Sequence, residues 1–157
     1  MPAKPAQKNS NAQMAKHLVN VVSDTYLLMI KTHGYHWNVT GPLFPQLHLL
    51  LEKQYNELFE AADEIAERIR ALDFPAPGST QMFHQHTAVK EASGQALSAM
   101  AMVKDLLKTH EQVRDRVEEG RAFANEIEDT ATEDLLNKRL EAHDKTMWML
   151  RSTAQAA

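Results

Sequence analysis

The stretch LHLLLEKQYNELFEAADEIAERIRAL, residues 47–72, decides the fold class of this chain. Its apolar residues recur every three or four positions, at Leu47, Leu51, Tyr55, Leu58, Ala62, Ile65, Ile69 and Leu72. On a helix this spacing forms one continuous stripe, which is typical of a helix that packs in a bundle. Neither Gly nor Pro interrupts the stretch, so we expect one long helix here.

Three other stretches predict long helices with the same period. The first follows Ser10 or Asn11, either of which can cap a helix, and it ends in the turn at residues 38–42. We expect Pro42 to open the next helix, because proline is favoured in a first helical turn. The last two helices are predicted at about residues 98–127 and 132–153.

The link between the second and third helices, residues 73–97, is much longer than the other two. It starts with the breaker-rich run DFPAPGST at Asp73, and we expect a short helix near residues 88–95. Two short turns and one long crossover predict an all-α chain, a ferritin-like four-helix bundle over residues 10–157.

The composition excludes several classes of protein. With 157 residues, 43% of them hydrophobic and 24% charged, the chain suits one globular domain. It has no Cys, which excludes disulfides, thiolate catalysis and Cys-ligated metal sites, and we expect a cytoplasmic location. We expect no membrane span and no signal peptide, because no apolar run is long enough and the first residues lack an apolar core.

The charge of the chain bears on nucleic-acid binding. A formal net charge of −4 argues against a DNA-binding surface on the folded body. Residues 1–9 lack helical periodicity and carry Lys4 and Lys8, so we predict a disordered N-terminal arm.

Four ionisable residues of the 47–72 helix form two pairs, His48 with Glu52 and Asp63 with Glu67. Each pair is spaced i, i+4, which places its two side chains one turn apart on one face, as two ligands of one metal ion must be. Taken alone, each pair is more often part of a solvated face, because the rest of this helix is also rich in charged residues.

The geometry of a helix relates the two pairs. His48 and Asp63 are separated by about 22 Å along the axis, too far to share a metal ion within one chain. Around the axis they differ by only about 60°, so both pairs lie on nearly the same flank. An antiparallel two-fold pairing of this helix with its copy would bring His48 and Glu52 of one chain to Asp63 and Glu67 of the other, and would form two equal sites.

The types of ligand favour iron as the metal. Carboxylates with a minority of imidazoles suit iron better than structural zinc. No Glu is followed three positions later by His, so the sequence lacks the Glu-x-x-His pattern of bundles that hold two irons internally. His36, at the end of the first helix, would lie close to His48 if the turn between the helices is tight.

These residues also carry a resemblance to a known family. After about residue 12, nearly the whole chain resembles the Dps family, the DNA-binding proteins from starved cells, which are ferritin-like. The resemblance rests on YHWNVTGP at residues 35–42, Phe44, His48, Glu52, Tyr55, DEIAER at residues 63–68, DTATEDLL at residues 129–136 and DKTMWML at residues 144–150.

The resemblance implies a ferroxidase. Dps proteins form dodecameric shells with iron centres at dimer interfaces, oxidise Fe(II) with hydrogen peroxide or dioxygen, and store a ferric mineral, which protects DNA. By residue match, one subunit supplies His36, His48 and Glu52, and its two-fold partner supplies Asp63 and Glu67, to a di-iron or mono-iron centre. Family members often have Asp where this chain has Glu52.

Further residues receive roles from the same resemblance. Trp37 resembles a tryptophan beside the iron centre, and His33 is a candidate for the second shell of ligands or a plain surface residue. An acidic cluster surrounds the turn between the last two helices, at Glu126, Glu128, Asp129, Glu133 and Asp134. It resembles the acidic pore that admits Fe(II) at a threefold axis, with Asp129, Glu133 and Asp134 as the candidates, and a solvated acidic turn is the alternative.

Four other histidines are not expected to bind the metal ion. His84 and His86 form a His-x-His pair in the long crossover with no carboxylate close in sequence, and their role stays open. His110 and His143 fall on apolar stripes, so we expect core histidines with a hydrogen-bonded partner.

Two other functions remain open from the sequence. The first is a nucleoid-associated protein that compacts DNA through Lys4, Lys8 and Lys16 with little iron chemistry. The second is a helical interaction bundle that binds no iron.

Overall fold

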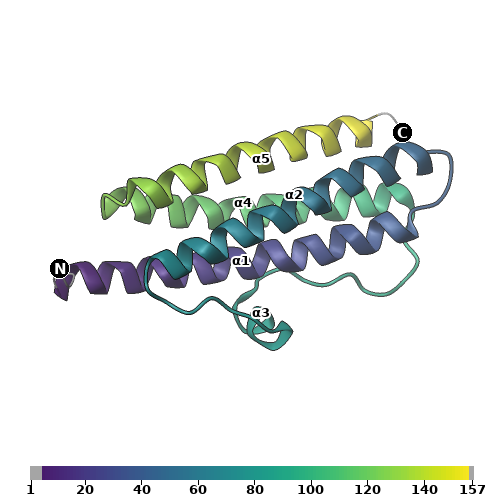
Figure 1. Ribbon diagram of the computed structural model, residues 1–157. Coiled ribbons are helices and arrows are strands. Elements are labelled where there is room, and N and C mark those ends of the chain that lie inside the picture. Colours follow the sequence, from purple (N-terminus) through teal and green to yellow (C-terminus); the bar gives the residue numbers. More distant parts are fainter. Residues whose placement is uncertain (1–4, 156–157) are drawn as a thin grey trace.

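The computed structural model describes residues 5–155, and all regular structure in this range is helical. Four long helices lie side by side, and a fifth, short helix lies in the crossover (Figure 1). Their bounds are Pro5–Asn38 for α1, Phe44–Ala71 for α2, Thr80–His86 for α3, Ala99–Glu126 for α4 and Thr130–Gln155 for α5. The predicted four-helix bundle with one long crossover is confirmed.

Helix α1 begins earlier than the sequence pattern indicates. Its first residue is Pro5, ahead of the predicted caps Ser10 and Asn11. Proline suits a first helical turn, and the residues after it are good helix formers, so the helix extends without apolar periodicity. The predicted arm therefore overlaps α1 by five residues, and Lys4 lies outside the described range.

Helix α2 begins later than predicted, at Phe44, with Pro45 in its first turn. Pro42 lies in the preceding turn instead, directly after Gly41. The proline that opens the helix was therefore predicted three positions too early.

The prediction of a short helix near residues 88–95 is wrong. The short helix α3 lies before this segment, where the Ser79 side chain caps it by accepting a hydrogen bond from the Met82 N–H at 3.2 Å. Phe83 fixes α3 to the bundle by stacking on Tyr26 of α1 at 4.4 Å between ring centroids. Residues 88–95 form no helix, and Gly94 adopts a positive φ of 72° there.

The predicted apolar stripes form one core. Helices α1 and α2 run antiparallel, as do α4 and α5 (Figure 1). The fully buried side chains include Met14, Leu18, Leu28, Leu47, Leu51, Leu58, Ile65, Ile69, Leu106, Leu136 and Leu150. They come from all four long helices, so each helix contributes one face to the same interior.

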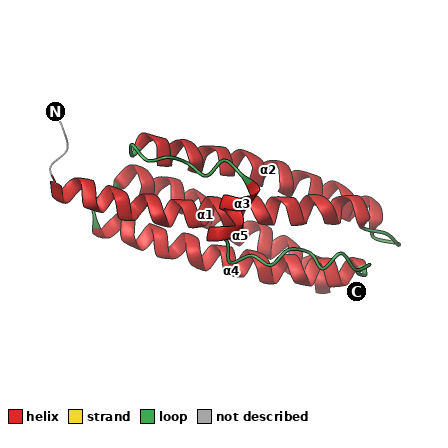
Figure 2. Cartoon of the chain, turned by 90° about the horizontal axis from the view of Figure 1, so that it is seen from below, coloured by secondary structure: helices red, strands yellow, loops and turns green. Residues whose placement is uncertain are grey.

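A buried acid fastens the crossover to the bundle. Asp24 of α1 is 0% exposed and accepts hydrogen bonds from the Thr87 hydroxyl and the Ala88 N–H, both at 2.7 Å. Arg116 of α4 completes its coordination at 3.1 Å. The crossover consequently runs along one side of the bundle, next to α1 (Figure 2). Within the described residues, no helix is long and apolar enough to cross a membrane.

Candidate metal centre

The turn between α1 and α2 brings two candidate ligands together. Gly41 has a φ of 95°, a conformation that side chains oppose, and its carbonyl accepts the Phe44 N–H at 3.0 Å. The chain therefore reverses direction within a few residues. His36 in the last turn of α1 then faces His48 in the first turns of α2.

His36 and His48 are locked in one arrangement. Their rings stack with centroids 3.8 Å apart and planes at 19°. The His36 Nδ1 lies 2.8 Å from the carbonyl oxygen of His48, and the His48 Nδ1 lies 3.0 Å from the carbonyl oxygen of His36. A carbonyl only accepts, so both Nδ1 atoms carry the hydrogen, and in the neutral rings both Nε2 atoms keep a free lone pair. This is the form in which imidazole binds a metal ion.

Aromatic rings surround this pair. His33 lies between Trp37 and Tyr55, with ring centroids 4.0 Å from each. Tyr55 also presents its edge to His36 at 5.2 Å. Burial and, to a smaller extent, the neighbouring His36 lower the pKa of His33. A neutral His33 is compatible with a position next to metal ligands. Trp37 is 66% exposed and packs on one side only.

The carboxylates divide between the two ends of α2. Glu52 is half-buried one turn after His48, whereas Asp63 and Glu67 are exposed in the second half of the helix. Within residues 5–155, no three His, Asp or Glu side chains of one chain come together as a metal site. The structure thus joins His36 with His48 and leaves Asp63 and Glu67 apart from them, as the helix geometry predicts.

The surface beside Asp63 is apolar. Phe59 is 57% exposed one turn before Asp63. A shallow pocket of about 220 Å³ lies at this place, with Tyr26, Phe59 and Asp63 among its lining residues. Large exposed apolar side chains beside an acidic pair are typical of a surface that another protein covers.

Asp129, predicted for the acidic pore, has a structural role in this chain. Its carboxylate caps α5 by accepting the Thr132 N–H at 3.1 Å, and Arg68 of α2 binds it at 2.7 Å. Burial raises the pKa of Asp129, but the hydrogen bonds from Thr132 and Arg68 lower it by more, so that its pKa falls below the usual value. An Asp directly before a helical pattern is a capping signal, which could have assigned this residue from the sequence.

The other two pore candidates differ in their surroundings. Glu133 accepts from Asn125 at 3.1 Å and lies 3.4 Å from Arg121, so its charge is partly matched. Asp134 is exposed, and no ion pair to it occurs in the described part of the chain. Of the three acids, Asp134 has the charge most open to solvent.

The remaining histidines divide between the core and the surface. His110 and His143 are buried core residues whose Nδ1 atoms lie 2.9 Å apart, so the predicted hydrogen-bonded partner is confirmed. His84 is an exposed residue 3.5 Å from Glu91 in the crossover, and His86 is exposed nearby.

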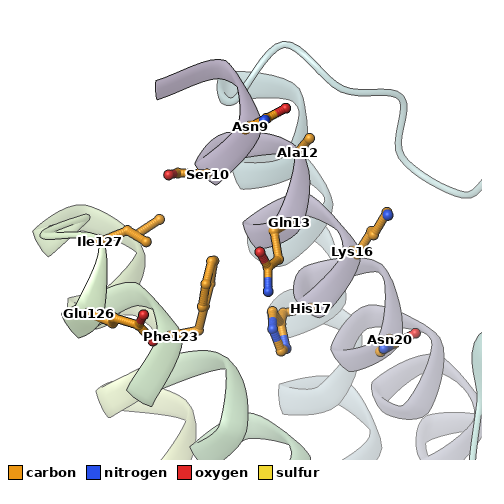
Figure 3. Close-up of a pocket in the computed structure, with 10 residues that line it drawn as sticks. All are labelled: Asn9, Ser10, Ala12, Gln13, Lys16, His17, Asn20, Phe123, Glu126 and Ile127. Carbon is orange, nitrogen blue, oxygen red and sulfur yellow. The ribbon is translucent and has the colours of Figure 1, made fainter. Parts of the chain in front are cut away.

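A larger pocket lies away from the candidate centre. It has a volume of about 690 Å³ and lies between the first half of α1 and the last turn of α4 (Figure 3). His17 and Phe123 stack at its base with centroids 5.1 Å apart. Glu126, a member of the acidic cluster compared with the pore, lines this pocket, whereas the residues predicted for the metal centre do not.

Comparisons with known proteins agree with this architecture. A family model described as a ferritin-like domain matches residues 15–156. The chain is 42% identical to an uncharacterized low temperature-induced protein of Nostoc sp., over 83% of this chain and 74% of that protein. It is 32% identical to DNA protection during starvation protein 2 of Bacillus anthracis, over 90% of this chain and 97% of that one.

Solved structures show the same arrangement of helices. Dps from Thermosynechococcus elongatus superposes with a TM-score of 0.90 at 29% identity, over 94% of both chains. A Dps protein from Vibrio cholerae, described as a member of a broad superfamily of ferritin-like diiron-carboxylate proteins, gives 0.88 at 25% identity, over 92% of this chain and 91% of that one.

Proposed function

Because the chain belongs to the Dps family of ferritin-like proteins, we propose that it oxidises Fe(II) at a site shared between two copies and stores the ferric product. The relatives named for DNA protection and for diiron-carboxylate chemistry support this reading. The proposed role is the protection of DNA by removing Fe(II) and peroxide together.

The His36–His48 pair is the observation that carries the proposal. Both rings are held by the main chain with Nδ1 protonated, so both can present a basic Nε2 without rearrangement. A site whose ligands are fixed in advance binds its ion without first ordering side chains. Glu52, one turn along α2, adds the first carboxylate.

A second copy would complete the site. Asp63 and Glu67 are about four and five turns from His48 along α2, so a two-fold partner must supply them. The exposed Phe59, which lines the pocket beside Asp63, gives such a partner an apolar side chain to bury. Assembly beyond the dimer, to a dodecameric shell, is proposed from the family alone.

The residues divide the chemistry between them. Imidazole nitrogens favour Fe(II), and the carboxylates of Glu52, Asp63 and Glu67 stabilise the greater charge of Fe(III). Two Fe(II) ions each give one electron to one hydrogen peroxide, whose O–O bond breaks, and the two oxygen atoms leave as water or hydroxide. Delivery of both electrons at one site avoids the release of a hydroxyl radical. Dioxygen is the alternative oxidant.

Mixed assemblies test whether the site is shared. We expect His48→Ala and Asp63→Ala to oxidise Fe(II) slowly when each is assembled alone. Refolded together, half of the dimers contain one chain of each kind, and each of these has one intact site, so about one quarter of the wild-type activity returns. Recovery is measured as ferric absorbance after peroxide is added to anaerobic Fe(II) protein.

The matched control mixes two variants of the same half-site. His48→Ala with Glu52→Ala leaves every His36–His48–Glu52 half-site damaged, so no activity should return. Equal recovery in both mixtures, or none in the first with mixing confirmed by mass spectrometry, would refute the shared site.

DNA compaction is the second candidate function. Lys8 and Lys16 are exposed on α1, whose first turns project past the ends of the other helices (Figure 1). The chain's net charge of −4 opposes binding to phosphate, so this contact would depend on many weak contacts at once.

A further inference from the structure

Three helices place polar side chains at one level of the apolar core. His110 of α4 and His143 of α5 are 2% and 1% exposed, and their Nδ1 atoms lie 2.9 Å apart. Gln54 of α2 is also buried. The ion pair between Glu57 and Arg139 joins α2 to α5, which run antiparallel. One turn back from Glu57 is Gln54 and one turn forward from Arg139 is His143, so both lie at the same level.

The hydrogen bonds of this layer are incomplete. Five buried atoms have no hydrogen-bond partner within the described residues: Gln54 Oε1, Gln54 Nε2, His110 Nε2, His143 Nε2 and Arg139 Nε. Buried polar groups in native proteins are nearly always paired, and a partly satisfied network is weaker than an apolar core. The unpaired atoms of this layer therefore lower the stability of the interior.

We propose that the His110–His143 pair is an acid-sensitive latch, whose protonation loosens α5 from α4. In the neutral pair, one Nδ1–H donates to the bare Nδ1 of the other ring. A first added proton must bind a bare Nε2, which creates a cation in the core. A second must bind the accepting Nδ1, which removes the acceptor and sets two N–H groups against each other at 2.9 Å.

No free carboxylate faces the pair to stabilise such a cation. Arg139 of α5 acts on both histidines, and Glu57 of α2 binds it. Arg114 of α4 acts on His143, and Asp144 binds it at 2.6 Å. The neighbouring ion pair between α1 and α4 joins Lys31 to Asp105 at 3.0 Å, and Lys31 also donates to Thr109, the residue before His110. Glu57, Asp144 and Asp105 are each paired with a cation, the neighbouring Glu111 is exposed, and Gln54 is neutral.

The two imidazoles therefore resist protonation in the fold. Burial, and then Arg139, lower the pKa of His110 to about 3. Burial, and then His110, Arg139 and Arg114, lower the pKa of His143 well below its ordinary value. In the unfolded chain the two histidines bind protons near pH 6.5. Their contribution to the free energy of unfolding is therefore fully present above that pH and is lost as the pH falls toward 3.

The size of the effect separates the latch from ordinary acid denaturation. For each unit that the pH falls below 6.5, one histidine lowers the folding equilibrium constant by up to about tenfold. The two together lower it by up to about a hundredfold per unit. Carboxylates whose pKa the fold lowers contribute mainly below about pH 5. The interval between pH 6.5 and 5 consequently reports on histidine.

Urea unfolding of the assembled full-length protein, followed by circular dichroism from pH 7.5 to 5 at one protein concentration, tests the latch. We expect the free energy of unfolding to fall as the pH is lowered across this interval. The slope should correspond to about two protons bound per chain on unfolding. His110→Leu/His143→Leu should remove most of this dependence, leaving the part due to the partly desolvated His17 and His33. His84→Gln, at an exposed site, should leave it unchanged.

Two more variants keep the test decisive. Gln54→Met removes two unpaired atoms but no histidine, so it should raise stability at every pH and keep the slope. Should the double variant fail to assemble, His143→Gln alone should lower the uptake to about one proton. The same pH slope in wild type and in the histidine variants would overturn the latch.

Discussion

His36 and His48 are held by each other's main chain: each Nδ1 faces the other residue's carbonyl oxygen, at 2.8 and 3.0 Å. Neither hydrogen bond needs the partner's ring. Removing one imidazole therefore leaves the other with its hydrogen-bond acceptor, and only the stacking at 3.8 Å is lost.

The first prediction follows from this arrangement. His48→Ala should weaken the binding of Co(II), an unreactive substitute for Fe(II), without abolishing it, because His36 keeps its tautomer and orientation. Isothermal titration should show a loss of about 10- to 100-fold in affinity. His84→Ala is the control and should change nothing. Complete loss of binding would show that the two rings orient each other.

The turn offers a test that changes no ligand. Gly41→Ala adds a Cβ that meets no atom within 4 Å, so the only penalty is the φ of 95°. We expect a loss of about 1–2 kcal/mol in the free energy of unfolding and weaker Co(II) binding, because relief of the strain moves His36 away from His48. Gly78→Ala, also in open space but without a positive φ, is the matched control.

Among the acidic residues, substitution of Asp24 should lower the free energy of unfolding the most. Asp24→Asn leaves Arg116 without its buried counter-charge and should lower the free energy of unfolding by about 3 kcal/mol. Limited proteolysis should then cut the crossover faster. Asp144→Asn breaks the exposed pair with Arg114 and should lower the free energy by less than about 1 kcal/mol. Similar losses in the two variants would contradict the anchoring role.

The acidic turn can be dissected one residue at a time. Asp134→Asn should slow Fe(II) uptake most at low ionic strength, because its charge is open to solvent and salt screens the attraction. Glu133→Gln should have a smaller effect, since Arg121 already lies 3.4 Å away. Stopped-flow oxidation at several salt concentrations measures this. Equal rates for all proteins at every salt concentration would mean that iron enters elsewhere.

Asp129→Asn should act on stability and leave iron uptake unchanged. Its folded pKa lies below the unfolded value, so its contribution is present above about pH 4 and is lost as the pH falls further. Asn keeps the cap on Thr132 but loses the charge toward Arg68, which should cost about 1–2 kcal/mol at pH 7. At pH 3 the variant and the wild type should differ less. Slower iron uptake in this variant would support the predicted place of Asp129 in the pore.

The fold could be predicted from the sequence because its signals are local. The stripe from Leu47 to Leu72 repeats without a breaker, and both short turns carry Gly, Pro or acidic residues. The position of α3 could not be predicted in the same way. It depends on the stacking of Phe83 on Tyr26, a residue 57 positions earlier in the chain, and on the hydrogen bond between Thr87 and Asp24.

The candidate site was predicted to a similar extent. Helix period alone separates His48 from Asp63, and the structure places His36 beside His48. The tautomers could not be predicted, because they are set by two carbonyl groups whose direction depends on the turn at Gly41. The ligand roles themselves remain a prediction that the mixed assemblies test.

The spacing of the two half-sites along α2 has a consequence for the newly made chain. A single subunit carries every ligand but cannot gather them, so in the proposed dimer the rate of oxidation depends on encounter between chains. Freshly synthesised monomers would be inert toward iron and peroxide while still unassembled. The chemistry would begin only once two copies have met, and assembly would act as the checkpoint that keeps ferric product from forming on isolated subunits.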